Sequence, residues 1–162
     1  MINLIHGDCL EVMKDIESDS IDLTVTSPPY DNLRTYKDSL QWNEGIWKKV
    51  IESLYEITKQ GGVVVWVVGD ATIKGSETGT SFKQALYFKE CGFNVETMIW
   101  EKTGSGCLGS NKFYGQNFEY MFVITKGFPK TFNLIKDRAN KVKSGKVKVN
   151  SGLGKDGKGK NY

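Results

Sequence analysis

The chain has 162 residues, of which 39% are hydrophobic and 25% are charged, and a formal net charge of +3. Its length fits a single domain with a sizeable core, and no apolar run is long enough to cross a membrane. The N-terminus does not follow the pattern of a signal peptide. The three cysteines are an odd number without metal-type spacing, which argues against a disulfide framework. We therefore expect a cytoplasmic protein that makes no membrane contact and needs no metal.

The charge is distributed unevenly. Residues 136–162 contain nine Lys or Arg and two Asp, whereas residues 1–135 contain thirteen Lys or Arg and seventeen Asp or Glu. We interpret residues 1–135 as the globular region and residues 136–162 as a flexible basic tail or the start of a recognition region. A basic extension suits a phosphate backbone, although the same composition is also typical of a solvated, disordered tail.

Short elements are predicted at the N-terminus. Asn3–His6 reads as a strand, Leu10–Ile16 as a short helix and Ile21–Thr26 as a second strand. His6 is the only histidine, which excludes a histidine-rich zinc site and Ser-His-Asp catalysis, so we interpret it as a residue of the first strand.

A longer helix and a buried strand follow. Gly45–Gln60 has the apolar spacing of an amphipathic helix, and Gly61-Gly62 is predicted to cap it. Val63–Val68 is continuously apolar and β-branched, which is typical of a strand in the middle of a parallel sheet that helices cover on both faces.

The second half of the globular region continues the alternation. Ser81–Cys91 is predicted as a helix, and Val95–Glu101 and Glu119–Thr125 as strands, whereas no apolar period remains beyond Asn140. This order predicts an α/β fold with a mostly parallel sheet, an antiparallel hairpin at one edge and helices on both faces.

The segment Ser27–Tyr30 has the sequence Ser-Pro-Pro-Tyr and follows a predicted strand. It resembles the catalytic loop of amino-methyltransferases that act on the exocyclic nitrogen of DNA bases. The amino group of a base is a poor nucleophile, and the resemblance implies that the Ser27 oxygen and the Pro28 carbonyl accept its hydrogens. Pro29 stiffens the loop, and Tyr30 offers a ring on which a flipped base stacks. An ordinary strand-ending turn or a proline-rich ligand segment is the alternative.

The resemblance to the N4-cytosine/N6-adenine family extends over most of residues 1–130 and implies a partial Rossmann-like methyltransferase sheet. Besides the Ser-Pro-Pro-Tyr stretch, the matching segments are Gly7–Glu11, Trp47–Gly69, Ile99–Lys102 and Phe118–Tyr120. The resemblance implies S-adenosylmethionine as the cofactor and double-stranded DNA as the substrate. It places Asp8 near the cofactor's adenine, with Cys9 and Ser27 also on the cofactor side, although Asp8 is equally well a turn residue.

Family members with Ser at the first loop position usually methylate cytosine N4, so the resemblance favours cytosine N4 over adenine N6. For DNA contacts we predict Arg34, Lys37, Phe113 and Tyr114, with a glycine-rich DNA-facing loop at residues 104–109. Solvated loop charges are the alternative for the two cations. Phe113, Tyr114 and Phe118 could form a platform for the flipped base. Packing at the edge strand is the alternative for these aromatic residues, and we favour it for Phe118.

One family feature is missing from the sequence. The glycine-rich Phe-x-Gly-x-Gly loop that holds the methionine end of the cofactor has no match in residues 125–162. A truncated or cleaved chain, one half of a split enzyme, or a non-catalytic DNA-binding protein explains this absence. A methyltransferase that acts on another amino group, such as a protein amide, is a weaker alternative. A homodimer or a complementing chain would complete the sheet.

Overall fold

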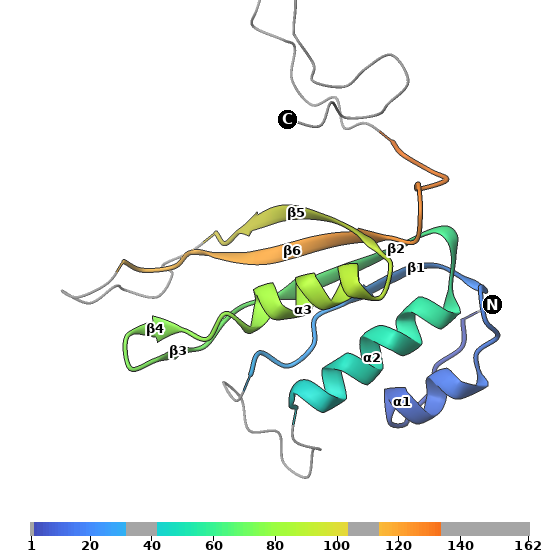
Figure 1. Cartoon of the computed structure of the whole chain (residues 1–162), viewed down its shortest axis with the longest axis horizontal. Helices are drawn as coiled ribbons and strands as arrows, with labels where there is room; N and C mark the ends of the chain where they lie inside the picture. Colours follow the sequence, from blue (N-terminus) through green and yellow to red (C-terminus); the bar gives the residue numbers. More distant parts are fainter. Residues whose placement is uncertain (1, 32–41, 104–113, 134–162) are drawn as a thin grey trace, which may run out of the picture. The chain divides into compact units, whose positions relative to one another are not determined.

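The computed structural model describes residues 2–31, 42–103 and 114–133, and the elements are labelled in Figure 1. The helical elements are α1 (Cys9–Val12), the short 3-10 helix η1 (Met13–Asp15), α2 (Glu44–Ile57) and α3 (Thr80–Glu90). The strands are β1 (Ile21–Thr26), β2 (Thr58–Val68), β3 (Thr72–Ile73), β4 (Ser76–Glu77), β5 (Asn94–Glu101) and β6 (Phe118–Thr125).

Four strands form one sheet in the order β1-β2-β6-β5. β1 pairs with β2 in parallel, whereas β6 runs antiparallel to both β2 and β5. The predicted α/β class and the antiparallel edge hairpin, which is β5–β6, are therefore confirmed. The described sheet has one parallel and two antiparallel pairings, so parallel pairing is not its majority. The reason is that β6 lies between β2 and β5, which are parallel to each other.

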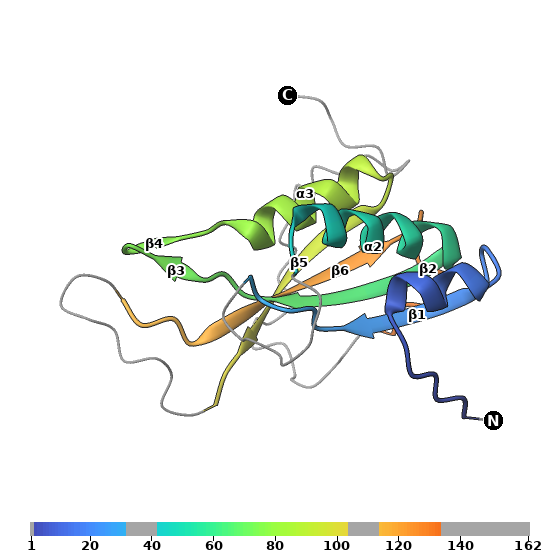
Figure 2. The same cartoon turned by 90° about the horizontal axis from the view of Figure 1, so that it is seen from below.

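The described helices cover one face of the sheet, as Figure 2 shows for α2 and α3, so the expected helices on both faces are not present in the described residues. The connections β1-α2-β2 and β2-α3-β5 both move across the sheet in the same direction. Because such crossovers are right-handed, both helices are placed on the same side. Between helices and sheet lies the core, which includes Ile51, Trp66 and Ile124.

The opposite face of the sheet is open. Leu23 and Val25 of β1 are 58% and 67% exposed, and Met98 and Trp100 of β5 are about half exposed. Side chains alternate between the two faces of a strand, so these four residues lie on the face that no described helix covers.

The predicted elements of the central region are confirmed within one or two residues, with the exception of the end of α2 and the start of β2, which begins five residues earlier than predicted, at Thr58. The Val63–Val68 run lies between β1 and β6, and it sends Val64, Trp66 and Val68 into the core. Asn43 caps the start of α2, because its side-chain Oδ1 accepts a hydrogen bond from the Ile46 N–H at 3.1 Å.

The predicted strand at Asn3–His6 is wrong. These residues are exposed and belong to no helix or strand. A strand needs a neighbour to pair its backbone groups, and no described strand pairs with this segment.

The predicted cap at Gly61-Gly62 is also wrong, because α2 ends at Ile57 and β2 begins at Thr58. The two glycines lie inside β2, where its register against β1 shifts between Ile21 and Leu23. Gly61 has a φ of +78°, and a Cβ at Gly62 would stand 3.0 Å from the Ile21 carbonyl oxygen. The glycines therefore form a β-bulge, at which the backbones of the two strands approach closely. In the sequence, such a Gly-Gly pair looks the same as a helix stop.

No helix in the three described ranges is long and apolar enough to cross a membrane.

A substitution of Ile124 tests whether the core lies on the face of the sheet that the helices cover. Its side chain is fully buried under the helices, whereas Ile73 in the β3–β4 hairpin is 59% exposed. We expect Ile124→Ala to lower the free energy of unfolding by about 2–5 kcal/mol because it leaves a cavity. Ile73→Ala, the matched control, should change it by no more than about 0.5 kcal/mol. Denaturant titration measures both, and equal effects would contradict the described core.

Candidate active site

The Ser-Pro-Pro-Tyr loop begins where β1 ends, at Thr26. Thr26 pairs with Trp66 of β2, so the two parallel strands end at the same edge of the sheet. Ligands of open α/β sheets bind outside the carboxyl ends of the strands. Ser27 is exposed at this edge, Pro28 is buried and Tyr30 is partly buried, so the loop is anchored while its serine faces solvent.

The ring of Tyr30 lies against the end of β2. A Cβ built on Gly69 would stand 3.4 Å from Cδ2 of Tyr30, and the ring also packs against the core. Gly69 therefore allows the tyrosine ring to approach the backbone closely. Through this contact the loop after β1 and the end of β2 form one unit.

The hydroxyl of Tyr30 connects the loop to the hairpin. It donates a hydrogen bond to Oε2 of Glu119 on β6 at 2.9 Å, and it lies 3.0 Å from Oγ of Ser27. The other oxygen of Glu119, Oε1, forms an ion pair with Nζ of Lys102 at 2.8 Å. That ammonium lies 4.0 Å from the centre of the Trp100 ring, a distance typical of a cation–π contact. A continuous polar chain therefore runs from Ser27 to Lys102.

The end of the hairpin is held by two further hydrogen bonds. The Lys102 N–H donates to the Asn117 carbonyl at 3.0 Å, and the Asn117 side chain donates to the Lys102 carbonyl at 2.8 Å. Lys102 is thus fixed by its backbone. In the sequence, Glu119 and Lys102 stand out only as parts of the family segments, and nothing there indicates their contact with the loop. An acidic residue in an otherwise aromatic and apolar strand was the available signal.

A second cluster of acidic side chains lies just beyond β2. Asp70 is buried, and its carboxylate accepts hydrogen bonds from the Ser81 N–H at 2.9 Å and from the Ser81 hydroxyl at 2.5 Å. Thr78 donates to Oδ2 of Asp31 at 2.6 Å. Because Gly79, at the start of α3, has no side chain to cap the helix, the Asp70 carboxylate takes that role. The cluster joins the residue after Tyr30 to the start of α3.

Asp8 and Cys9 stand at the beginning of α1. Oδ1 of Asp8 accepts a hydrogen bond from the Leu10 N–H at 2.9 Å, so this carboxylate caps the helix. Cys9 is largely exposed, yet partial desolvation, with the adjacent Asp8 charge, raises the pKa of its thiol. Asp8 is therefore the N-cap of α1, and not a turn residue after a strand, because no strand precedes it in the described residues. A role of Asp8 toward a cofactor stays a prediction.

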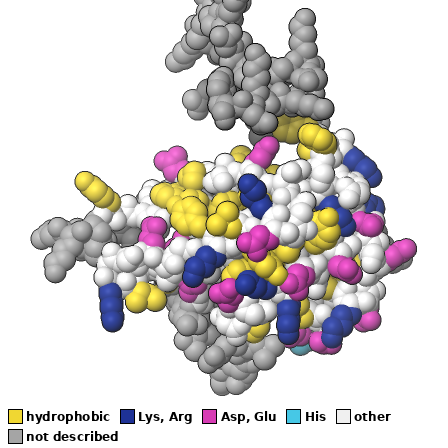
Figure 3. Space-filling view, in the orientation of Figure 1, with side chains coloured by type: hydrophobic (Ala, Val, Ile, Leu, Met, Phe, Trp, Pro, Cys, Tyr) yellow, Lys and Arg dark blue, Asp and Glu magenta, His cyan; other side chains and the backbone are white. Residues whose placement is uncertain are grey.

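The predicted DNA contacts are only partly described. Arg34, Lys37, Phe113, the loop at residues 104–109 and the tail at residues 136–162 lie outside the described residues. Tyr114 is wholly exposed. Phe118 is partly buried, and its ring centre lies 5.4 Å from that of Tyr120, which agrees with the packing alternative. On the face drawn in Figure 3, acidic and basic side chains of the described residues are interspersed.

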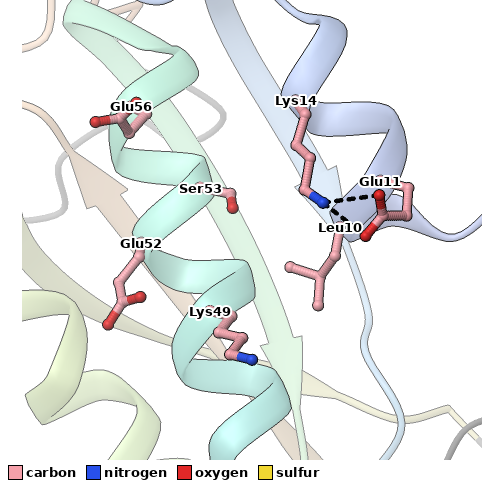
Figure 4. Close-up of a pocket in the computed structure, with 7 residues that line it drawn as sticks. All are labelled: Leu10, Glu11, Lys14, Lys49, Glu52, Ser53 and Glu56. Atoms are coloured by element: carbon pink, nitrogen blue, oxygen red, sulfur yellow. Dashed lines mark hydrogen bonds and ion pairs between the residues drawn. The ribbon is translucent and has the colours of Figure 1, made fainter.

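One described cavity, of about 450 Å³, lies between α1 and α2 and is shown in Figure 4. Its lining contains no residue of the Ser27–Tyr30 loop and no aromatic side chain, and the residues are Leu10, Glu11, Lys14, Lys49, Glu52, Ser53 and Glu56. Glu11 and Lys14, which both lie on the α1–η1 side of the cavity, form an ion pair at 2.7 Å. The cavity offers no ring on which a base could stack, so we do not assign the base to it.

Comparisons with known proteins define the class. The family model described as DNA methylase, of the N6/N4 type, matches residues 21–162, and the chain therefore belongs to this methyltransferase family. Among the curated relatives is the orphan methyltransferase M.BamHII of Bacillus amyloliquefaciens, 54% identical over 144 residues. That match covers 88% of this chain and 49% of the relative, so the chain spans about half the length of M.BamHII.

Solved structures show the same fold. The PvuII DNA methyltransferase, described as cytosine-N4-specific, superposes with a TM-score of 0.63 at 22% identity, over 76% of this chain and 49% of that one. A DNA modification methylase from Thermus thermophilus in complex with S-adenosyl-L-methionine gives a TM-score of 0.58 at 22% identity, over 81% and 57%. The partial Rossmann-like methyltransferase fold is therefore confirmed.

Asp8 provides a test that separates helix capping from ligand binding. Asp8→Ala should lower the free energy of unfolding by about 1 kcal/mol, whereas Asp8→Asn should leave it nearly unchanged because Asn caps helices equally well. If Asp8 also binds a cofactor through its charge, Asp8→Asn weakens S-adenosylmethionine binding at unchanged stability. Denaturant titration and calorimetry distinguish these outcomes, and equal destabilisation by both variants would contradict the capping role.

Proposed function

We propose that this chain is the catalytic portion of an S-adenosylmethionine-dependent DNA methyltransferase that modifies an exocyclic amino group, cytosine N4 in preference to adenine N6. The observation that carries the proposal is the placement of Ser27–Tyr30 at the carboxyl end of β1, with Ser27 exposed and Tyr30 anchored to Glu119. The preference for cytosine rests on Ser at the first loop position and on the likeness to the cytosine-N4-specific PvuII enzyme.

In this proposal the loop binds and orients a flipped base. The Ser27 oxygen and the Pro28 carbonyl accept the two amino hydrogens, which localises the nitrogen lone pair for attack on the methyl group that the cofactor supplies. Pro28 is buried, and the chain after it is stiffened by Pro29, so these acceptors are preorganised. Tyr30 stacks on the base, which contributes roughly 1–3 kcal/mol.

The described residues fit the cofactor in part. Asp8 lies after Gly7 in the segment where the family places an acid near the cofactor's adenine, and its Oδ1 is engaged in capping α1. The sequence has no Phe-x-Gly-x-Gly loop for the methionine end. We therefore assign Asp8, Cys9 and Ser27 to the cofactor side as proposals, and no further contact. Arg34, Lys37, Phe113 and Tyr114, together with the basic tail, are proposed to contact DNA.

A second candidate is one half of a split enzyme, which a complementing chain or a second copy completes. The uncovered apolar face favours it, because Leu23 and Val25 are each more than half exposed on β1, the edge strand of the described sheet. Exposed apolar faces and unpaired edges favour association. Sedimentation of the chain alone, with and without duplex DNA, tests this candidate. A monomer that methylates DNA without any partner would exclude it.

Ser27 provides the direct test of catalysis. We expect Ser27→Ala to reduce methyl transfer to duplex DNA by about a hundredfold or more, because it removes an acceptor from the reacting amino group. Ser18→Ala, in an exposed turn, is the matched control and should retain full activity. Transfer is followed with labelled S-adenosylmethionine, and nucleoside analysis separates N4-methylcytosine from N6-methyladenine.

Undiminished turnover in Ser27→Ala would refute the mechanism. A folded chain that binds DNA in a salt-dependent manner, without methyl transfer or cofactor binding, would instead favour a non-catalytic DNA-binding protein.

A further inference from the structure

We infer that Glu119 is a positioning residue, which acts through Tyr30 to set the direction of the Ser27 hydroxyl. The inference rests on the proposed function, since it concerns how Ser27 meets the amino group. It is carried by the polar chain Ser27–Tyr30–Glu119–Lys102, in which each neighbour lies within 3.0 Å of the next.

The direction of each hydrogen bond in this chain follows from which groups carry a hydrogen. A carboxylate only accepts hydrogen bonds, so Tyr30 must donate its single hydroxyl hydrogen to Glu119. The Tyr30 oxygen, 3.0 Å from Ser27, is then able only to accept from Ser27. Ser27 therefore directs its hydrogen inward to Tyr30 and presents its lone pairs outward. An outward lone pair is what an amino N–H of the base requires.

Lys102 sustains this arrangement. Its ammonium binds Oε1 of Glu119, while Tyr30 binds Oε2, so the two partners use different oxygens of one carboxylate. The ammonium itself lies over the Trp100 ring, and the backbone of Lys102 is held by Asn117. The Glu119 side chain is only 21% exposed, so the hydrogen bond between Tyr30 and Glu119 is partly shielded from competing water.

The isosteric variant Glu119→Gln should reverse the direction of the hydrogen bonds from residue 119 through Tyr30 to Ser27. Its amide oxygen would face the Lys102 ammonium, which turns the NH2 group toward Tyr30. Tyr30 would then accept from the amide and donate to Ser27, and the Ser27 hydrogen would point at the substrate. A Ser27 hydrogen that points outward repels the hydrogens of the amino group. The variant would therefore lose activity although the shape of the site is unchanged.

The kinetic test is a double-mutant cycle on methyl transfer. We expect Glu119→Gln to lower kcat by about a hundredfold, with KM for DNA changed by less than about threefold. In a Tyr30→Phe background the same substitution should have no further effect, because the connection to Ser27 is already broken. Glu101→Gln, on the adjacent strand and exposed, is the matched control and should retain activity. Additive losses, or a change confined to KM, would overturn the inference.

A second measurement does not depend on turnover. With ¹³C-labelled tyrosine rings, NMR detects whether the Tyr30 hydroxyl hydrogen is protected from exchange with water. The inference predicts protection in the wild type and in Ser27→Ala, and loss of protection in Glu119→Asp, whose shorter side chain does not reach. Protection lost in Ser27→Ala but kept in the Glu119 variant would show the reverse direction and refute the inference. Absence of methyl transfer by the wild type, with the predicted protection pattern, would count against the proposed function alone.

Discussion

The structure depends on the position of β2 between a parallel and an antiparallel neighbour. Pairing with β1 brings the carboxyl ends of both strands to one edge, and antiparallel pairing with β6 brings the start of β6 to the same edge. Ser27, Gly69 and Glu119 therefore meet although they are distant in sequence. The continuous apolar Val63–Val68 run suits this position, because such runs are typical of strands in the interior of a sheet.

The Ser27–Tyr30 loop is held from two sides. Gly69 allows the Tyr30 ring to lie on the end of β2, and Glu119 binds the hydroxyl of the same ring from β6. Glu119 itself lies on the face that no described helix covers, since it pairs directly with Trp100, which lies on that face.

Much of this arrangement could be predicted from sequence. The strand before Ser-Pro-Pro-Tyr, the amphipathic helix and the β5–β6 hairpin follow from local periodicity and turn residues. Two local interpretations failed: Asn3–His6 has strand-like residues but no strand beside it, and Gly61-Gly62 forms a bulge instead of a helix stop. The Tyr30–Glu119 contact joins residues 89 positions apart, and such a pairing depends on strand order and register, which no local pattern records. The helices on one face follow from two crossovers in the same direction, which also requires the strand order.

The most direct test of the account is a crystal structure of this chain with S-adenosylmethionine, duplex DNA and whatever complementing chain it requires. We expect a base flipped out of the duplex and stacked on Tyr30, with its amino nitrogen within hydrogen-bond distance of Ser27 Oγ and the Pro28 carbonyl. A target base that stays stacked in the duplex, or an amino group directed away from Ser27 in a complex active in solution, would contradict it.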